Sequence, residues 1–550
     1  MTQAKNILFV MFDQLRWDYL SCTGHPHLHT PNIDALAADG VMFSQAYVQS
    51  PVCGASRMSF YTGRYVQSHG ATWNRVPLKV GERTMGDHLR DSGMDCWLVG
   101  KTHMKADIEG MARLGLDPNT MIGSRVAQCG FDVWERDDGL HAEGPDGKYD
   151  DLGDVPYNAY LRDKGYHSAN PWHDFANSAR SEKDPEQMAS GWFMQNARKP
   201  AAIQNDDSET PYMTTRAIEF MEQAGAGPWC VHLSYIKPHW PYIAPAPYND
   251  MYGPEHVIPV ARDEGEKVDA QPVFKAFQDN RVGTTFSRDE VRETAIPAYM
   301  GLIKQCDDQM GRLFDWLKET GRWDDTLIVL TSDHGDYLGD HWMGEKDLFH
   351  DCSSKVPLII RDPSLSADAT RGTICDALVE AIDLAPTFLE VAGGAPRPHV
   401  LEGRSLMPWV RGEQPDWRGF VISEYDYTLN PAVASLDADP RQGGMFMVAD
   451  ERWKFVHAEG MRGQLFDKQN DPLELVDLWN CPEHAQIISM MSERLASWGR
   501  RVSQRTTFSD AQVLTERNRS GGRGIALGLY EGTEIAESMI PYYRGKPRPA

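Results

Sequence analysis

Two pairs of polar residues, far apart in the chain, are candidates for binding a metal ion. Asp13-Gln14 and Asp333-His334 each come directly after a run of apolar residues. Such a run ending in polar side chains is typical of a buried parallel strand whose carboxyl end opens onto a site. Together the pairs offer carboxylates, an amide oxygen and an imidazole, which are ligands of divalent metals. We therefore expect the four side chains to converge on one divalent ion at one edge of a sheet.

Basic residues and histidines follow two further apolar runs. Lys101 and His103 stand just beyond residues 95–99, and His239 stands just beyond residues 228–235. Because Lys101 and His103 are two residues apart, both can face the same ligand from an extended segment. The chain has 79 acidic and 55 basic side chains, a formal net charge of −24. A site for an anion must therefore gather its cations locally, and these residues are the candidates.

The elements that must position these groups alternate between strands and helices. Apolar runs predict strands at residues 7–12, 95–99, 228–235 and 326–330. Helical spacing occurs at residues 84–92, 212–224 and 303–320, and Thr30-Pro31 starts a further helix. This alternation predicts an α/β fold with a large mixed, mostly parallel sheet sandwiched by helices.

The later part of the chain has a different pattern. Short strands are expected at residues 421–424, 444–448 and 453–457, and helices at 471–479 and 487–502. We expect a catalytic α/β domain over 1–400, a smaller C-terminal α+β domain over 401–505 and a C-terminal arm over 506–550. Residues 104–207 and 255–292 have weak periodicity and are expected to be long surface excursions near the site or oligomer contacts.

The C-terminal arm predicts an assembly. It has little core-forming pattern, and its apolar residues would leave exposed surface if the protein were a monomer. These residues are Ile525, Leu527, Leu529 and Tyr530. We expect a homo-oligomer, a dimer or tetramer, in which the arm reaches a neighbouring subunit.

Composition and cysteine usage exclude several classes of protein. Hydrophobic residues make up 41% of the 550, enough for a sizeable core, and the negative charge argues against nucleic-acid or membrane-surface partners. No apolar run approaches the ~20 residues of a membrane span, and the first run is too short for a signal peptide. The nine cysteines are irregularly spaced without a Cys-x-x-Cys, which predicts reduced thiols and a cytoplasmic protein.

The most specific local pattern surrounds Cys53. The segment Pro51-Val52-Cys53-Gly54-Ala55-Ser56-Arg57, followed by Thr62-Gly63-Arg64, resembles the signature of the sulfatase family, Cys-x-Pro-x-Arg with a downstream Thr-Gly-Arg. This family belongs to the alkaline phosphatase superfamily and includes arylsulfatases, choline sulfatases and phosphonate monoester hydrolases. Other family landmarks occur in order along nearly the whole chain: Asp13-Gln14, Thr30-Pro31-Asn32, Gly100-Lys101 with His103, Lys237-Pro238-His239, Ser332-Asp333-His334-Gly335 with Gly339-Asp340-His341 and Lys346, and Leu465-Phe466-Asp467 with Asp471-Pro472.

The resemblance implies that Cys53 is oxidised after synthesis to formylglycine by a formylglycine-generating enzyme. One departure bears on this step, because Ala55 stands where the family usually has Pro. Pro would favour the extended form of the segment that the modifying enzyme binds. Arg57 is intact, so modification is still expected.

The resemblance also implies roles around residue 53. Its hydrated aldehyde completes the metal shell and takes up the sulfuryl group as a covalent intermediate. Arg57 and Lys101 supply fixed positive charge. His103 deprotonates the second hydroxyl, and the intermediate then collapses and expels sulfate.

Three further residues are assigned to the substrate by the same resemblance. His239 and Lys346 are expected beside the leaving oxygen and a non-bridging oxygen. Asn74 is expected to hydrogen-bond the anion. The substrate is thus a small-molecule sulfate or phosphonate ester.

Two details narrow the branch of the family. Gln14 and His334 resemble the phosphonate monoester hydrolase and choline sulfatase branch, whereas Lys101 and His103 match the arylsulfatase pattern. A cation pair suits monoanionic sulfate, so we expect aryl sulfate hydrolysis with promiscuous phosphonate or phosphodiester activity. Because His334 moves the shell away from oxygen ligands alone, Mn²⁺ is as good a candidate as Ca²⁺.

Several alternatives stay open. A phosphonate monoester hydrolase, a phosphodiesterase or a choline-sulfatase-like alkyl sulfatase would use the same residues. A chain whose Cys53 is never oxidised would be a non-catalytic binding protein. Trp73, Trp240 and Tyr242 could stack on an aromatic leaving group, but packing explains them equally well.

Overall fold

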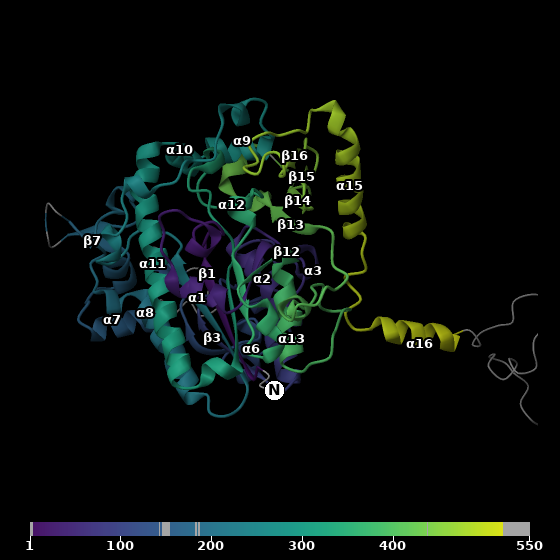
Figure 1. The fold of residues 1–550 in the computed structure, drawn as a ribbon, viewed down its shortest axis with the longest axis horizontal. Coiled ribbons are helices and arrows are strands. Elements are labelled where there is room, and N and C mark those ends of the chain that lie inside the picture. Colours follow the sequence, from purple (N-terminus) through teal and green to yellow (C-terminus); the bar gives the residue numbers. More distant parts are fainter. Residues whose placement is uncertain are drawn as a thin grey trace, which may run out of the picture.

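The computed structural model describes residues 4–141, 144–145, 155–181, 184, 187–436 and 438–520. Figure 1 shows a central sheet with helices on both faces, a smaller sheet beside it, and a helix that extends away from the body. Among the described residues, no helix is both long and apolar enough to cross a membrane.

Eight strands of the described chain form the central sheet, in the order β12-β2-β11-β10-β1-β9-β3-β4. Their bounds are β1 Asn6–Asp13, β2 Val41–Tyr47, β3 Asp95–Gly100, β4 Asp132–Arg136, β9 Trp229–Pro238, β10 Thr326–Ser332, β11 Leu358–Arg361 and β12 Thr373–Glu380. Only β11 runs antiparallel to its neighbours. The expected mixed, mostly parallel sheet is confirmed. The four strands expected from apolar runs are β1, β3, β9 and β10, which lie side by side at its centre.

Burial on both faces explains the uninterrupted apolar run of β1. Its even-numbered residues from Leu8 to Phe12 join one core, and its odd-numbered residues from Ile7 to Met11 join the other. The first core includes α8 (Glu209–Gln223) and α11 (Asp289–Glu319), and the second includes α2 (Cys53–Thr62), α4 (Met85–Asp91) and α13 (Leu384–Val391). The sheet is therefore sandwiched by helices, as expected.

The segment 104–207 contributes more to the fold than surface loops. Its strand β4 pairs with β3 as the edge of the central sheet. Three of the five residues of β4, Asp132-Val133-Trp134-Glu135-Arg136, are charged, which is ordinary for an edge strand. A search for continuous apolar runs misses such a strand.

A second sheet is formed by β13 (Val421–Asp426), β14 (Gly444–Ala449), β15 (Trp453–Ala458) and β16 (Gln464–Asp467), all antiparallel. The helix α15 (Ala485–Gly499) packs on it through Met491 and Trp498. The helix expected over 471–479 is wrong, because this segment is a loop. The carboxylate of Asp477 holds it by accepting the backbone N–H groups of Leu465 and Trp479.

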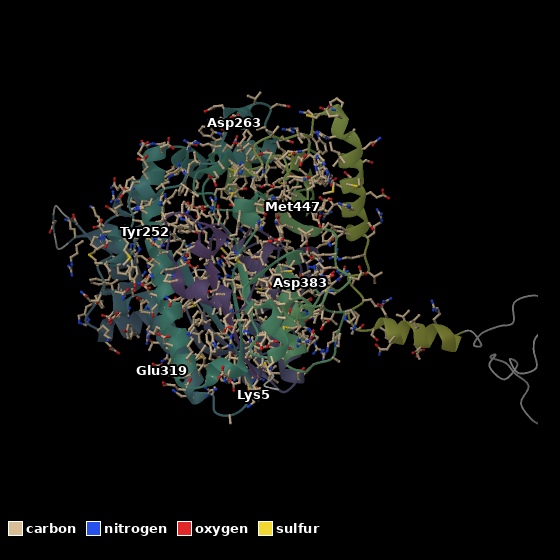
Figure 2. The ribbon with its side chains drawn as sticks, viewed as in Figure 1. Lys5, Tyr252, Asp263, Glu319, Asp383 and Met447 are labelled. Carbon is tan, nitrogen blue, oxygen red and sulfur yellow. The ribbon has the colours of Figure 1, made fainter. Side chains whose placement is uncertain are left out.

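The two sheets share an apolar core that reaches the segment around Cys53. Side chains fill the space between the layers, and Met447 of β14 is one of them (Figure 2). Val52 and Ala55, on either side of Cys53, belong to the same cluster as Met447. The start of α2 is therefore fixed by packing against the C-terminal sheet.

The remaining α-helices and strands of the described residues are short. They are α1 Pro31–Ala38, α3 Val66–His69, α5 Ile108–Arg113, α6 Met121–Ala127, α7 Pro156–Asp163, α9 Pro272–Asp279, α10 Arg281–Phe286, α12 Asp351–Ser354, α14 Met407–Val410, α16 Asp510–Ser520, β5 Leu140–His141, β6 Gly144–Pro145, β7 Ser178–Arg180 and β8 Met188–Ser190. In Figure 1, α16 extends away from the body. The other arm residues singled out from the sequence, Ile525, Leu527, Leu529 and Tyr530, lie outside the described residues.

Candidate active site

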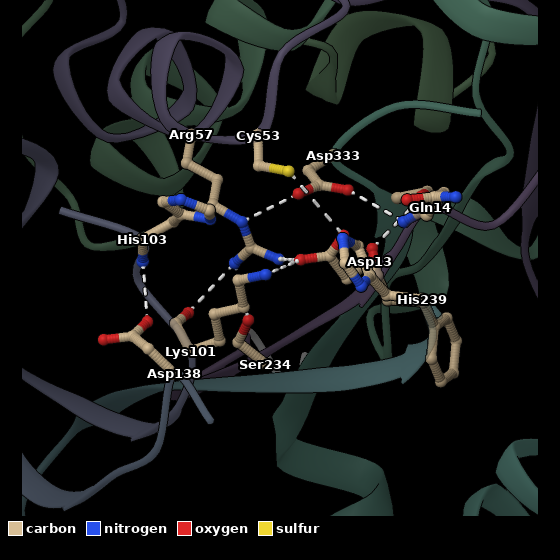
Figure 3. A network of polar contacts seen from close by, with 12 residues as sticks. Asp13, Gln14, Cys53, Arg57, Lys101, His103, Asp138, Ser234, His239 and Asp333 are labelled. Atoms are coloured by element: carbon tan, nitrogen blue, oxygen red, sulfur yellow. Dashed lines mark hydrogen bonds and ion pairs between the residues drawn. The ribbon is translucent and has the colours of Figure 1, made fainter. Parts of the chain in front are cut away.

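Groups from four neighbouring strands meet at the carboxyl edge of the central sheet. Asp13 ends β1, and Asp333 directly follows β10. Lys101 follows β3, and His239 follows β9. Cys53 is the first residue of α2, and its thiol points toward the same place (Figure 3). Because adjacent parallel strands end at one edge, residues far apart in sequence form one cluster.

Four of these groups fit a divalent metal ion. One ligand atom from each of Asp13, Cys53, Asp333 and His334 lies within 4.8 Å of the others, and all four residues are buried. His334 Nδ1 lies 2.8 Å from the Gly335 carbonyl, which can only accept a hydrogen bond. The imidazole proton is thus on Nδ1, and Nε2 is left to bind a metal. Burial lowers the pKa of His334, which favours the neutral form that metal binding needs.

Gln14 presents its amide oxygen to the same cluster. Its backbone is left-handed, with φ 66°, and its N–H donates to Asp333 Oδ1 at 3.0 Å. Its side-chain Nε2 donates to Asp336 and to the Tyr242 hydroxyl. These partners fix the amide so that Oε1 faces Lys346 Nζ at 3.1 Å. Asp336, which positions the amide, was not singled out in the sequence.

Arg57 bridges the carboxylates of Asp13 and Asp333. It is fully buried, and it donates to Asp333 Oδ2 at 2.8 Å and to Asp13 Oδ2 at 3.2 Å. Its remaining bonds go to the Lys101 carbonyl at 2.9 Å and the Ser234 hydroxyl at 2.7 Å. These four contacts fix the position of the Arg57 guanidinium, which in turn fixes the orientation of the two carboxylates.

Two lysines bring positive charge to the open side of the cluster. Lys101 Nζ lies 2.5 Å from Asp13 Oδ2, and Lys346 Nζ lies 3.1 Å from both Cys53 Sγ and His239 Nε2. Burial alone would raise the pKa of Asp13, but the surrounding cations, Lys101 foremost, hold it well below its usual range. The carboxylate is therefore ionised and available to a metal.

His239 is held as a neutral acceptor. Its Nδ1 faces the Trp240 carbonyl at 2.7 Å, so Nε2 is free to accept from Lys346. Burial and then the charge of Lys346 hold the pKa of His239 well below its usual range. A lysine and a neutral imidazole thus share a hydrogen bond beside Cys53.

His103 is positioned by Asp138, a residue that the sequence analysis did not single out. The His103 backbone is left-handed, with φ 51°, which costs energy for a side chain other than glycine. Asp138 Oδ1 accepts the N–H groups of Thr102 at 3.0 Å and of His103 at 2.8 Å (Figure 3). Arg136 of β4 holds the other oxygen at 2.7 Å. His103 Nδ1 is buried and has no hydrogen-bond partner among the described residues.

Asn74 lies at the amino end of α2. Its Oδ1 accepts the N–H of Gly54 at 2.8 Å, satisfying a group that the helix itself leaves unpaired. Its donor nitrogen is the part suited to an anion. Asn74 also lines the cavity described next.

A cavity of about 530 Å³ opens onto the cluster. This volume is in the range of small-molecule sites. The expected residues on its wall are Asn74, Lys101, His103, His239 and Lys346, and its aromatic residues are Trp73, Trp172 and Trp240. Every expected site residue is thus either in the buried cluster or on the wall of this cavity.

Comparisons with known proteins agree with this arrangement. A family model described as Sulfatase matches residues 5–118 and 158–395, and one described as N-sulphoglucosamine sulphohydrolase, C-terminal, matches residues 339–501. The multifunctional alkaline phosphatase superfamily protein PehA of Trinickia caryophylli is 30% identical over 547 residues, covering 94% of this chain and 99% of that protein. An arylsulfatase of Clostridium perfringens is 27% identical, covering 89% of this chain and 93% of that protein.

The structural comparison gives the same result. The crystal structure of the phosphonate monoester hydrolase of Agrobacterium radiobacter matches with a TM-score of 0.76 and 28% identity, covering 90% of this chain and 95% of that chain. The sulfatase match spans most of the chain, including Cys53 and both strand ends with metal-ligand side chains. The chain therefore belongs to the sulfatase family, the metal-dependent sulfuric ester hydrolases of the alkaline phosphatase superfamily.

Proposed function

We propose that this protein hydrolyses sulfate monoesters, above all aryl sulfates, with formylglycine made from Cys53 as its nucleophile. The observation that carries this proposal is the set of atoms around one sulfur. Cys53 Sγ lies 3.0 Å from His334 Nε2, 3.1 Å from Lys346 Nζ and 3.9 Å from Asp13 Oδ1. A nucleophile at residue 53 would stand between metal ligands and fixed positive charge, which is what transfer of an anionic group requires.

Asp13, Gln14, Asp333 and His334 would hold one divalent ion together with residue 53. A shell that mixes oxygen and imidazole ligands suits Mn²⁺ as well as Ca²⁺. When bound, the ion would lower the pKa of a hydroxyl on the hydrated formylglycine, as it does for water. The chain's own contribution is to hold these ligands buried and closed to bulk water.

Lys101 and Lys346 would stabilise the charge of the bound anion. Burial lowers the pKa of each lysine, but the acidic groups beside them more than compensate and raise it. Both side chains are therefore ammonium ions, aimed at the space next to Cys53. His239, which accepts from Lys346 at 3.1 Å, forms with it a pair that can deliver a proton to the leaving oxygen.

His103 is the proposed base for the second half of the reaction. Its Nδ1 has no partner among the described residues, so it can accept a proton from residue 53. Asp138 holds the backbone at Thr102 and His103, which would keep the residue in place while the sulfuryl group is attached. In this proposal, His239 acts on the leaving oxygen in the first step, and His103 acts in the breakdown of the intermediate.

Phosphonate monoester hydrolysis is the second candidate function. Structures of phosphonate monoester hydrolases from Agrobacterium radiobacter and Silicibacter pomeroyi each cover 90% of this chain, at 28% and 29% identity. Gln14 and His334 favour this branch, whereas Lys101 and His103 favour sulfate.

Two measurements test the proposal. Peptide mass spectrometry should find formylglycine at position 53 in protein made in a host with modifying activity. In the same preparation, kcat/KM for 4-nitrophenyl sulfate should exceed that for a phenylphosphonate ester, and Cys53→Ala should abolish both. A fully active protein with an unmodified thiol would contradict the nucleophile, and a preference for the phosphonate would make the second candidate the correct one.

We also propose that the protein acts in the cytoplasm. All nine cysteines are unpaired, which suits a reducing compartment. Its partners would be the modifying enzyme and further copies of the chain in a homo-oligomer. Growth under oxidising export conditions should yield inactive or misfolded protein if this compartment is correct.

A further inference from the structure

A second cavity adjoins the one at the candidate active site. Its volume is about 640 Å³, and four residues line both cavities. The shared residues are Trp240, Arg281, Val282 and Glu345. The two cavities therefore lie next to each other at these four residues.

Five aromatic residues lie on the wall of the second cavity. Trp192 and Phe193, from the loop after β8, face α10 with its residue Phe286. Trp192 packs edge-on against Trp240, with ring centroids 5.0 Å apart. Tyr242 completes the wall and packs edge-on against Phe286.

Phe193 is the residue of this wall that packing explains least. It is 62% exposed, so the folded chain gains little from its ring. A large apolar side chain left open at the mouth of a cavity is typical of a binding surface. The charged side chains around it, Arg281, Arg288 and Glu345, lie on the same cavity and would meet polar substituents.

Trp240 connects the reaction centre with this wall. It follows His239 directly, and their ring centroids are 4.3 Å apart. Its indole Nε1 is buried and has no hydrogen-bond partner among the described residues. Because Trp240 lines both cavities, a ligand that spans them would contact its ring.

We propose that the second cavity is a leaving-group subsite for a flat, apolar leaving group of two or more rings. The sulfuryl group would sit at Cys53 and the leaving oxygen beside His239. The first ring would pass Trp240, and the second would lie between Phe193 and α10. This inference rests on the proposed function and adds the class of alcohol released.

The test compares sulfate esters of a one-ring and a two-ring phenol with matched leaving-group pKa values. The wild-type protein should favour the two-ring ester, by about tenfold in kcat/KM if the second ring is largely buried. Phe193→Ala should remove most of that preference. Leu365→Ala, which removes a similarly exposed apolar side chain (66%) outside both cavities, should leave the ratio unchanged.

A binding measurement separates the two proposals. The free two-ring phenol should quench tryptophan fluorescence of Cys53→Ala protein, and more weakly when Phe193→Ala is added. If neither ester is cleaved but this binding is seen, the proposed function fails and the subsite stands. Equal rates for both esters, or binding that Phe193→Ala does not weaken, would overturn the subsite, as would tighter binding of a one-ring sugar than of the two-ring phenol.

Discussion

The two sides of Cys53 are built differently. On the metal side, Arg57 is fully buried and its hydrogen bonds go to Asp13, Asp333 and other protein atoms. On the cavity side, His103 Nδ1 and Trp240 Nε1 have no partner among the described residues. A network whose hydrogen bonds are all made within the protein is rigid, whereas side chains with unpaired groups beside a cavity are less constrained. The metal side therefore suits chemistry common to the family, and the cavity side suits selection of a substrate.

The pKa values of carboxyl groups on the two sides are shifted in opposite directions. Despite burial, the cations around Asp13 hold its pKa well below the usual range. At the cavity, burial raises the pKa of Glu345 to about 7. The carboxylate of Asp13 is therefore ionised before a ligand arrives, whereas the carboxyl group of Glu345 stays largely protonated below about pH 7.

The largest expected effect comes from breaking the metal side. Arg57→Met would leave the buried carboxylate of Asp333 without its arginine partner and would remove one of the cations beside Asp13, which costs about 3–5 kcal/mol in unfolding free energy, and it should abolish turnover. Urea unfolding and steady-state rates would measure both. Arg288→Met, at a side chain that is 62% exposed, is the control and should change stability by less than about 0.5 kcal/mol. A stable, active Arg57→Met protein would refute the contrast between the sides.

A second prediction separates two cavity-side residues. Lys101→Ala should slow the burst of phenol release by about 10²- to 10³-fold, because it removes a positioned charge. His103→Ala should still release about one equivalent of phenol and then stall with sulfate on residue 53. Rapid-mixing traces, with intact-protein mass at the plateau, distinguish the two. If His103→Ala gives no burst, and an ester with a better leaving group rescues it, then His103 serves the leaving group instead.

Asp138 should act through His103 and have a smaller effect. Asp138→Ala removes the acceptor of two backbone N–H groups, and the shift of the histidine should lower the steady-state rate by up to about 10²-fold. The burst should be affected much less than the steady state, which a general loss of structure would not produce. Asp138→Asn keeps an acceptor oxygen and should restore most of the rate. Equal losses in both phases would show a purely structural role.

The pH dependence of stability tests the cavity-side carboxyl. Because the folded protein raises the pKa of Glu345 from 4.5 to about 7, it holds this proton to a higher pH than the unfolded chain does. The resulting stability is fully present below about pH 4.5 and is lost as the pH rises through about 7. Urea midpoints measured from pH 5 to pH 8 should fall less steeply for Glu345→Gln than for wild type. Parallel slopes would mean that Glu345 is not perturbed.

The smallest effect on the site is expected from the C-terminal arm. Light scattering should give a multiple of the mass of one chain, and removal of residues 506–550 should reduce it. The rate on a small aryl sulfate should change little, because none of the cavity-lining residues comes from α16. A full-length protein with the mass of one chain would contradict the assembly.

The central strands were predictable because they are buried on both faces and therefore leave long apolar runs. The clustering of the candidate metal-ligand side chains followed, since parallel strands end at one edge. The edge strand β4 was not predictable in this way, because three of its five residues are charged and leave no continuous apolar run. Asp138 was missed with it, since it stands just beyond β4. The expected helix over 471–479 ignored Asp477, whose carboxylate competes for backbone N–H groups.

The burial of α2 has a consequence for timing. All ten of its residues, Cys53 to Thr62, are buried, and Val52 and Ala55 are locked into the core shared by the two sheets. An enzyme that must bind residues 51–57 in extended form cannot reach them once this core has closed. The proposed oxidation of Cys53 would therefore compete with folding and would have to occur during or soon after synthesis. With Ala55 in place of proline, a fast-folding chain would leave a larger share of molecules permanently inactive, and slower folding at low temperature should raise the active fraction.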